Sequence, residues 1–220
     1  MKQCLLLIQM NQKFEKLPPV APTEFAPLLG ILSKIKIPTK TSNAVGRSAF
    51  VHAHRACAIG TAYHFTKKTI NLSRMSRKHP DLHAEIMRLG ELICAPAGHT
   101  FTSVYLNNNC ISSPHRDKNN HGLIIIVSFG DYTGCRLVIE DEIADAHNQP
   151  IRFDGTNRLH WNEPDLVGNK FGLVFYPHKA IIKHRAQEVG CRGGVAPSQD
   201  SPSHTISPAE HLTPSPSYHH

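Results

Sequence analysis

His115 and Asp117 are the residues whose types and spacing most directly predict chemistry. They stand two positions apart, after an alternating stretch that starts at Thr100 and predicts a strand. In an extended chain, residues i and i+2 point to the same side. One short segment can therefore present an imidazole and a carboxylate to one metal ion, and we interpret the pair as two of three ligands of a ferrous ion.

The spacing alone is not specific, because the chain holds 16 histidines. His79 with Asp81, and His83 with Glu85, repeat the pattern. Both of these pairs lie where apolar residues recur at helical spacing, so we interpret them as solvated helix residues. The context of His115 differs, since polar residues separate two stretches that predict strands.

The third ligand must come from a distant segment, and the downstream candidates are His160, His178 and His184. Two imidazoles and one carboxylate on one triangular face leave three positions open, which suits ferrous oxygen chemistry. We favour His160, because a tight turn at 153–155 would aim the segment after it inward. His178 follows Pro177, where a surface position is expected.

The remaining histidines and cysteines predict no second metal site. The six cysteines are scattered without a Cys-x-x-Cys pair, which argues against a zinc-thiolate site and fits a reducing, intracellular compartment, nuclear or cytoplasmic. His52, His54, Cys57 and His64 have no carboxylate nearby, and we interpret them as incidental residues of a helix or strand.

Length and composition predict one domain with appendages. A chain of 220 residues with 40% hydrophobic content can bury one sizeable core. We expect an irregular N-terminal wrapping segment (1–48), a domain (49–190) and a disordered Ser/Pro-rich tail (191–220). We interpret Cys4 to Met10 as a buried strand or helix start rather than a signal peptide. No apolar run approaches the ~20 residues that cross a bilayer, so no membrane partner is expected.

The elements predict an α+β fold with a double-stranded β-helix, or jelly-roll, core and supporting helices N-terminal to the main strands. A helix is expected from Pro80 to Gly90 or Cys94. Strands are expected near 100–106, 123–129, 135–140, 149–153 and 170–176, with turns at 131–134, 148–150, 154–155 and 167–169.

The charge favours a polyanionic partner such as nucleic acid. The net charge is +7, and the last 30 residues hold one Arg and two acids, so residues 1–190 hold 23 basic against 15 acidic residues. Basic residues are dense from Lys67 to Arg88, with Ser and Asn between them, which suits a phosphate backbone.

A series of sequence blocks resembles the core of the 2-oxoglutarate and Fe(II)-dependent dioxygenases. Within that superfamily the blocks are most similar to the TET/J-binding-protein branch, which oxidises methyl groups on pyrimidine bases in DNA. The resemblance spans roughly residues 85 to 178. In chain order the blocks are Phe101-Thr-Ser-Val-Tyr-Leu-Asn-x-Asn, Pro114-His-Arg-Asp-Lys-Asn-Asn, Gly130-Asp-Tyr-Thr-Gly, Phe153-Asp-Gly, His160, and Gly168-Asn-Lys-Phe-Gly-Leu-Val-Phe-Tyr.

The resemblance implies an oxidoreductase that uses Fe(II), 2-oxoglutarate and dioxygen, with ascorbate as a reductant. His115, Asp117 and His160 are then the metal ligands and catalytic residues, and Lys170 binds the far carboxylate of the co-substrate. A base in duplex DNA must be flipped out to reach the metal. The expected substrate-binding residues are two amides on the strand that leads to the ligand loop, Asn107 and Asn109.

Two residues depart from the family pattern. Lys170 stands where the family has Arg, whose planar fork holds a carboxylate at two points while Lys offers a single charge. Cys135 stands where a second Gly is expected. The alternatives to a DNA-base dioxygenase are a protein side-chain hydroxylase on the same scaffold and a catalytically silent metal- or DNA-binding module.

Overall fold

The computed structural model describes residues 13–39 and 55–192. The predictions for Cys4 to Met10, for His52 and His54, and for residues 193–220 of the tail lie outside the described residues. No helix within the described part of the chain is long and apolar enough to span a bilayer.

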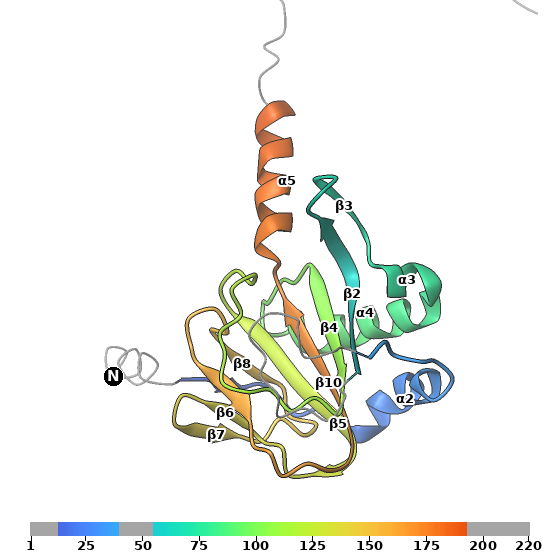
Figure 1. The fold of residues 1–220 in the computed structure, drawn as a ribbon, viewed down its shortest axis with the longest axis vertical. Coiled ribbons are helices and arrows are strands. Elements are labelled where there is room, and N and C mark those ends of the chain that lie inside the picture. The colour runs from blue at the N-terminus through green and yellow to red at the C-terminus, as the bar shows by residue number, and fades with distance from the viewer. Residues whose placement is uncertain (1–12, 40–54, 193–220) are drawn as a thin grey trace, which may run out of the picture.

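Two antiparallel sheets form the body of the molecule (Figure 1). The larger has seven strands in the order β1-β8-β5-β10-β4-β2-β3, and the smaller has three in the order β7-β6-β9. This arrangement confirms the predicted α+β, double-stranded β-helix fold. The strands are β1 (Glu15–Lys16), β2 (Arg55–His64), β3 (Thr69–Leu72), β4 (Ser103–Asn108), β5 (Ile124–Thr133), β6 (Leu137–Ile139), β7 (Glu142–Ala144), β8 (Ile151–Phe153), β9 (His160–Asn162) and β10 (Val167–Tyr176).

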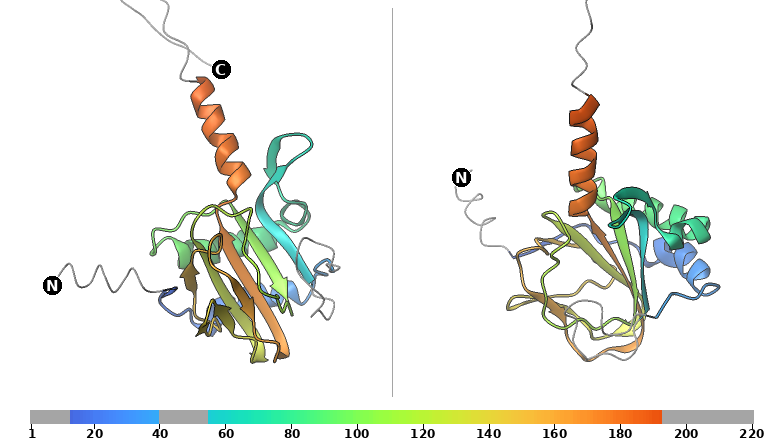
Figure 2. Two further views of the ribbon diagram at one scale, coloured as in Figure 1. Left: turned by 60° about the vertical axis from the view of Figure 1, so that its left-hand side comes forward. Right: turned by 45° about the horizontal axis from the view of Figure 1, so that its top comes forward.

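Helices cover the face of the larger sheet that turns away from the smaller sheet (Figure 2). These helices are η1 (Pro22–Phe25), α2 (Ala26–Leu32), α3 (Arg74–Lys78) and α4 (Pro80–Cys94). A further helix, α5 (Lys179–Arg192), follows β10. α4 begins and ends at predicted residues, because Pro80 occupies its first turn and its apolar residues recur every three or four positions. The two pairs that repeat the spacing of His115 and Asp117, His79/Asp81 and His83/Glu85, lie at the start of this helix, as expected.

The alternation of β10 separates two apolar clusters and fixes which side chains face the interior between the sheets. Leu173 and Phe175 pack in the cluster under the helices. Val174 and Tyr176 pack on the cluster formed by β6, β8 and their neighbours. Because side chains alternate along a strand, Lys170 points to the same side as Val174, into the space between the two sheets.

The five predicted strands are confirmed, but two of the predicted turns are wrong. Residues 131–133 and 167–169 are paired strand, with Gly168 opposite Tyr132. Gly168 has φ +98°, and a Cβ there would lie 2.3 Å from the Asp131 carbonyl oxygen. The glycine therefore allows a close approach between two strands rather than a chain reversal.

Several elements were not predicted. The short strands β3, β7 and β9 and the helices α3 and α5 were not expected, and the segment containing β2 was left open between helix and strand. β1, η1 and α2 lie in the segment that was predicted to be irregular. β7 and β9 have three residues each, too few to show a period, and each exists through its pairing with β6.

Candidate metal centre

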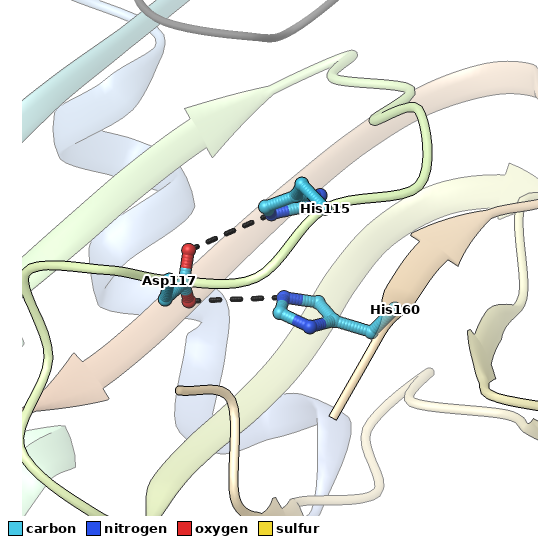
Figure 3. A group of neighbouring side chains, drawn as sticks. All are labelled: His115, Asp117 and His160. Carbon is cyan, nitrogen blue, oxygen red and sulfur yellow. Dashed lines mark ion pairs between the residues drawn. The ribbon is translucent and has the colours of Figure 1, made fainter. Parts of the chain in front are cut away.

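His115, Asp117 and His160 meet in the interior between the sheets (Figure 3). One ligand atom from each lies within 4.8 Å of the others. The Nε2 atoms of His115 and His160 lie 3.5 and 3.7 Å from the two carboxylate oxygens of Asp117. His160 is buried and the other two are partly exposed, so the three predicted ligands line one partly open site.

Backbone pairing brings these ligands together from segments 45 positions apart in the chain. His115 and His160 face each other in an antiparallel bridge, and each backbone N–H donates to the other residue's carbonyl at 3.0 Å. The Asp117 N–H donates to the Gly155 carbonyl at 2.8 Å. The ligand loop, residues 109–123, is therefore laid against β9 and the turn that follows β8. His115 and Asp117 point to one place, as the i, i+2 spacing predicts.

The imidazoles are oriented as metal ligands are. The Nδ1 of His115 lies 2.8 Å from the Ser113 carbonyl oxygen, and the Nδ1 of His160 lies 3.0 Å from the Arg158 carbonyl oxygen. A carbonyl only accepts, so each Nδ1 carries the proton, and in the neutral ring Nε2 is the nitrogen that can bind a metal. Two such imidazoles and a carboxylate fit a ferrous ion.

Asn120 forms a hydrogen bond to the carboxylate of Asp117. Its side chain is buried, and its Nδ2 donates to Asp117 Oδ2 at 3.0 Å. Sequence reasoning did not single it out, although it closes the quoted block that contains His115 and Asp117. Outer-shell partners of this kind orient the ligand that they contact.

We expect Asn120→Ala to weaken Mn(II) binding about 10- to 100-fold, the usual effect of losing an outer-shell hydrogen bond. The measurement is a calorimetric Mn(II) titration of the purified protein. Asn119→Ala is the matched control, because that side chain is exposed and only its backbone carbonyl is used, by the Lys179 N–H. Equal affinities in the two variants would contradict the role of Asn120.

Lys170 places a buried ammonium in the same interior. The residue is 7% exposed, and its Nζ donates to the Cys135 carbonyl at 2.7 Å and contacts the Cys135 Sγ at 3.2 Å. The Tyr132 ring lies 5.4 Å from it. Among residues 13–39 and 55–192, no carboxylate forms an ion pair with this ammonium. A buried charge without a counter-charge is costly, so the position is suited to an anion that binds from solution.

The surroundings of Lys170 hold it without neutralising it. Its backbone N–H donates to Asn109 Oδ1, and its carbonyl accepts from the Asn109 N–H, both at 2.8 Å. Burial raises the pKa of the Cys135 thiol, an effect that the charge of Lys170 opposes. Burial also raises the pKa of Tyr132.

The two predicted substrate amides differ in what they contact. Asn109 is engaged by the backbone of Lys170, which is a structural role. Asn107 lies opposite Gly172 in the register of β4 and β10, on the same side of the sheet as Lys170. Its Oδ1 is buried and accepts no hydrogen bond from the described residues, so it can receive a donor from a bound molecule.

The structure separates the other candidate ligands from this site. His178 is half-buried, at the start of α5, where its Nδ1 accepts from the Ala180 N–H, and burial lowers its pKa. The Nε2 of His184 contacts the Lys68 carbonyl oxygen at 3.0 Å. Cys57 is buried in the core under the helices and His64 is exposed at the end of β2, so the described members of the upstream group form no cluster.

Comparison with known proteins agrees with this architecture at the level of the fold. No family model and no curated protein sequence matches the chain. Among solved structures, NgTET1 in complex with 5mC DNA is similar with 15% identity, a TM-score of 0.50, and coverage of 76% of this chain and 73% of that chain. An oxidoreductase of the 2OG-Fe(II) oxygenase family from Burkholderia pseudomallei is similar with 14% identity, a TM-score of 0.51, and coverage of 81% and 91%. The chain therefore has the fold of the 2-oxoglutarate and Fe(II)-dependent oxygenases, as the resemblance of its sequence blocks predicts.

Proposed function

We propose that the protein is an Fe(II)- and 2-oxo-acid-dependent dioxygenase that oxidises a methylated pyrimidine base in DNA. The observation that carries the proposal is the placement of two groups in one interior: the His115–Asp117–His160 cluster, and a buried Lys170 that lacks a carboxylate partner among the described residues. The first group suits ferrous iron, and the second suits the far carboxylate of a 2-oxo diacid such as 2-oxoglutarate. When bound, iron would activate dioxygen, which is the oxidant: one oxygen atom would enter the substrate C–H bond and the other would enter succinate as the 2-oxo acid loses carbon dioxide, with ascorbate keeping the iron ferrous.

The residues of the chain contribute position and charge. Two neutral imidazoles and one carboxylate hold the ion and leave three positions free for the co-substrate and dioxygen. The ammonium of Lys170 attracts and orients the co-substrate, and Asn109 fixes the backbone from which that ammonium extends. Two buried apolar residues lie next to His160 and limit the access of water to it: the Phe153 ring, 5.0 Å from the His160 ring, and Ile139, its partner across the strands.

A nucleic-acid substrate is supported by charge and by the free amide in the interior. Residues 1–190 carry a surplus of basic residues, which favours a phosphate backbone. A base in a duplex has to leave the stack to reach a buried metal, and its Watson–Crick edge then needs polar partners. The buried Oδ1 of Asn107 is an acceptor that could meet the exocyclic amine of a cytosine-type base.

The test is mass spectrometry of oligonucleotides incubated with the protein, iron, 2-oxoglutarate and ascorbate. We expect one or more oxygen atoms to be added to a methylated pyrimidine, together with one succinate per oxidation. His160→Ala is expected to remove turnover, because it removes a ligand, whereas His178→Ala should keep most of it. Succinate release without an oxidised base would point to another substrate, such as a protein side chain.

A further inference from the structure

The hairpin of β2 and β3 extends past the edge of the larger sheet, beside α5 (Figures 1 and 2). In the strand register β2 pairs with β4 as far as Gly60, the Thr61 N–H still donates to the Thr102 carbonyl, and residues 62–64 pair with β3 alone. The tip of this hairpin is tied to α5, since the Nε2 of His184 contacts the Lys68 carbonyl oxygen at 3.0 Å. The two elements therefore form one projection on the same side of the molecule.

Phe65 lies at the tip of the hairpin with 65% of its surface exposed. Every other Phe, Tyr or Trp in the described part of the chain is buried or partly buried. The Tyr63 ring packs edge-on against the Phe65 ring, with centroids 5.1 Å apart. Such an exposed, supported aromatic ring is a surface that a flat partner can cover.

A short series of contacts joins Phe65 to the candidate metal centre. The Phe65 ring lies 6.3 Å from the ring of His178. His178 forms a β-bridge with Asn120, whose side chain donates to the Asp117 carboxylate. The ligand loop also meets α5, since the Lys179 N–H donates to the Asn119 carbonyl. Phe65 therefore stands on the rim of the site rather than on a remote surface.

The rim is strongly basic. We define it as three segments, residues 61–72, 115–121 and 178–188, which together contain seven Lys or Arg and two acids. One acid is the candidate ligand Asp117, and the other, Glu188, lies 3.5 Å from His184. The basic residues are Lys67, Lys68, Arg116, Lys118, Lys179, Lys183 and Arg185, and all seven are exposed. This charge is complementary to a phosphate backbone.

We propose that Phe65 is a stacking platform for an unstacked nucleobase next to the base that enters the metal site, while the basic rim binds the flanking phosphates. An aromatic ring interleaved with cations is how proteins bind single-stranded nucleic acid, because every base has a π-face and every linkage a phosphate. An acidic peptide would satisfy the charge and leave the exposed ring unused. The inference rests on the proposed function, since it names the strand that the same site would receive.

The test is the binding of a fluorescein-labelled single-stranded oligonucleotide to the full chain, followed by anisotropy over a series of salt concentrations. Phe65→Ala should weaken binding roughly 5- to 150-fold, the range expected for one base–aromatic stack, with an unchanged salt slope. Phe65→Trp should retain affinity. Substituting Lys67→Gln and Lys68→Gln together should lower the slope of log K against log salt by about 1 to 2.

Leu72→Ala is the matched control, because Leu72 is an exposed apolar residue of the same hairpin but pairs with Thr61 at its base. Near-UV circular dichroism would verify that each variant is folded. Equal affinities for Phe65→Ala and Leu72→Ala would overturn the proposal, as would equal competition by poly-glutamate and by single-stranded DNA.

Since binding is measured without turnover, a Phe65-dependent complex that yields no oxidised base would refute the proposed function and leave this inference standing. If a base is oxidised and neither binding nor oxidation depends on Phe65, the proposed function stands and this inference is refuted.

Discussion

Asp117→Ala is expected to abolish metal binding, with a loss larger than the ~10- to 100-fold effect of an outer-shell change. Asp117 supplies the only negative charge in the cluster of three, and both of its oxygens face an imidazole nitrogen. Without it, two neutral imidazoles leave a divalent ion uncompensated. Calorimetric titration with Mn(II), a stable substitute for Fe(II), measures the affinity directly.

Thermal unfolding gives an independent readout of the same prediction. A ligand that binds only the folded state stabilises it by an amount that grows with its concentration, ~2.7 kcal/mol at one hundred times the dissociation constant. The wild type should therefore unfold at a higher temperature with Mn(II), whereas Asp117→Ala should show no gain. Asp131→Ala removes an exposed carboxylate near the C-terminal end of β5, and its unfolding temperature should rise with Mn(II) as that of the wild type does. A metal-dependent gain in Asp117→Ala would place the ion elsewhere.

The parts of the fold that the sequence predicted are those whose signal is local. α4 was predicted because its apolar residues repeat every three or four positions over 15 residues. The side chains of His115 and Asp117 point to the same side, which follows from the geometry of a single extended segment. β10 was expected from a continuous apolar run, although its first three residues were assigned to a turn.

The parts that the sequence did not predict depend on distant pairing or on weak patterns. His160 meets His115 through a bridge across 45 positions, and the sequence suggested it only through the turn at 153–155 and the order of the blocks. α5 contains Lys, His and Arg on most of its turns, and its apolar residues form no continuous stripe. Phe65 has no distinguishing sequence signal, and Asn120 has only its place in the block of His115 and Asp117, because exposure at a hairpin tip and a hydrogen bond to a ligand are both products of tertiary structure.

Lys170→Ala is expected to weaken 2-oxoglutarate binding by ~2 to 5 kcal/mol, or roughly 30-fold to several thousand-fold, because it removes a desolvated charge partner. Mn(II) binding should survive, since Lys170 is not in the ligand cluster. The measurement is a titration of the Mn(II)-loaded protein with 2-oxoglutarate, with Lys34→Ala as a control that removes an exposed lysine. Wild-type affinity in Lys170→Ala would show that another cation holds the co-substrate.

Lys170→Met separates the charge of this residue from its packing. Methionine keeps an apolar stem of similar length, so a loss of affinity equal to that of Lys170→Ala would be due to the charge. The buried ammonium has no carboxylate partner in the described part of the chain, so its removal should also raise the unfolding temperature of the ligand-free protein. A stability that rises while co-substrate affinity falls is the result expected of a residue retained for binding. A decrease in both would indicate a structural lysine.

The two departures from the family pattern lie in contact with each other, and this predicts how they are coupled. The Sγ of Cys135 is 3.2 Å from the Nζ of Lys170, and Cys135 has φ +54°, a conformation that glycine adopts more readily. A guanidinium is bulkier than an ammonium, so we expect Lys170→Arg alone to clash with the thiol and to weaken 2-oxoglutarate binding. Adding Cys135→Gly should relieve the clash and restore affinity through the two-point contact of Arg with a carboxylate. The double-mutant cycle measures this coupling as the difference between the combined and the separate effects. Strictly additive effects would show that the lysine and the cysteine are independent substitutions.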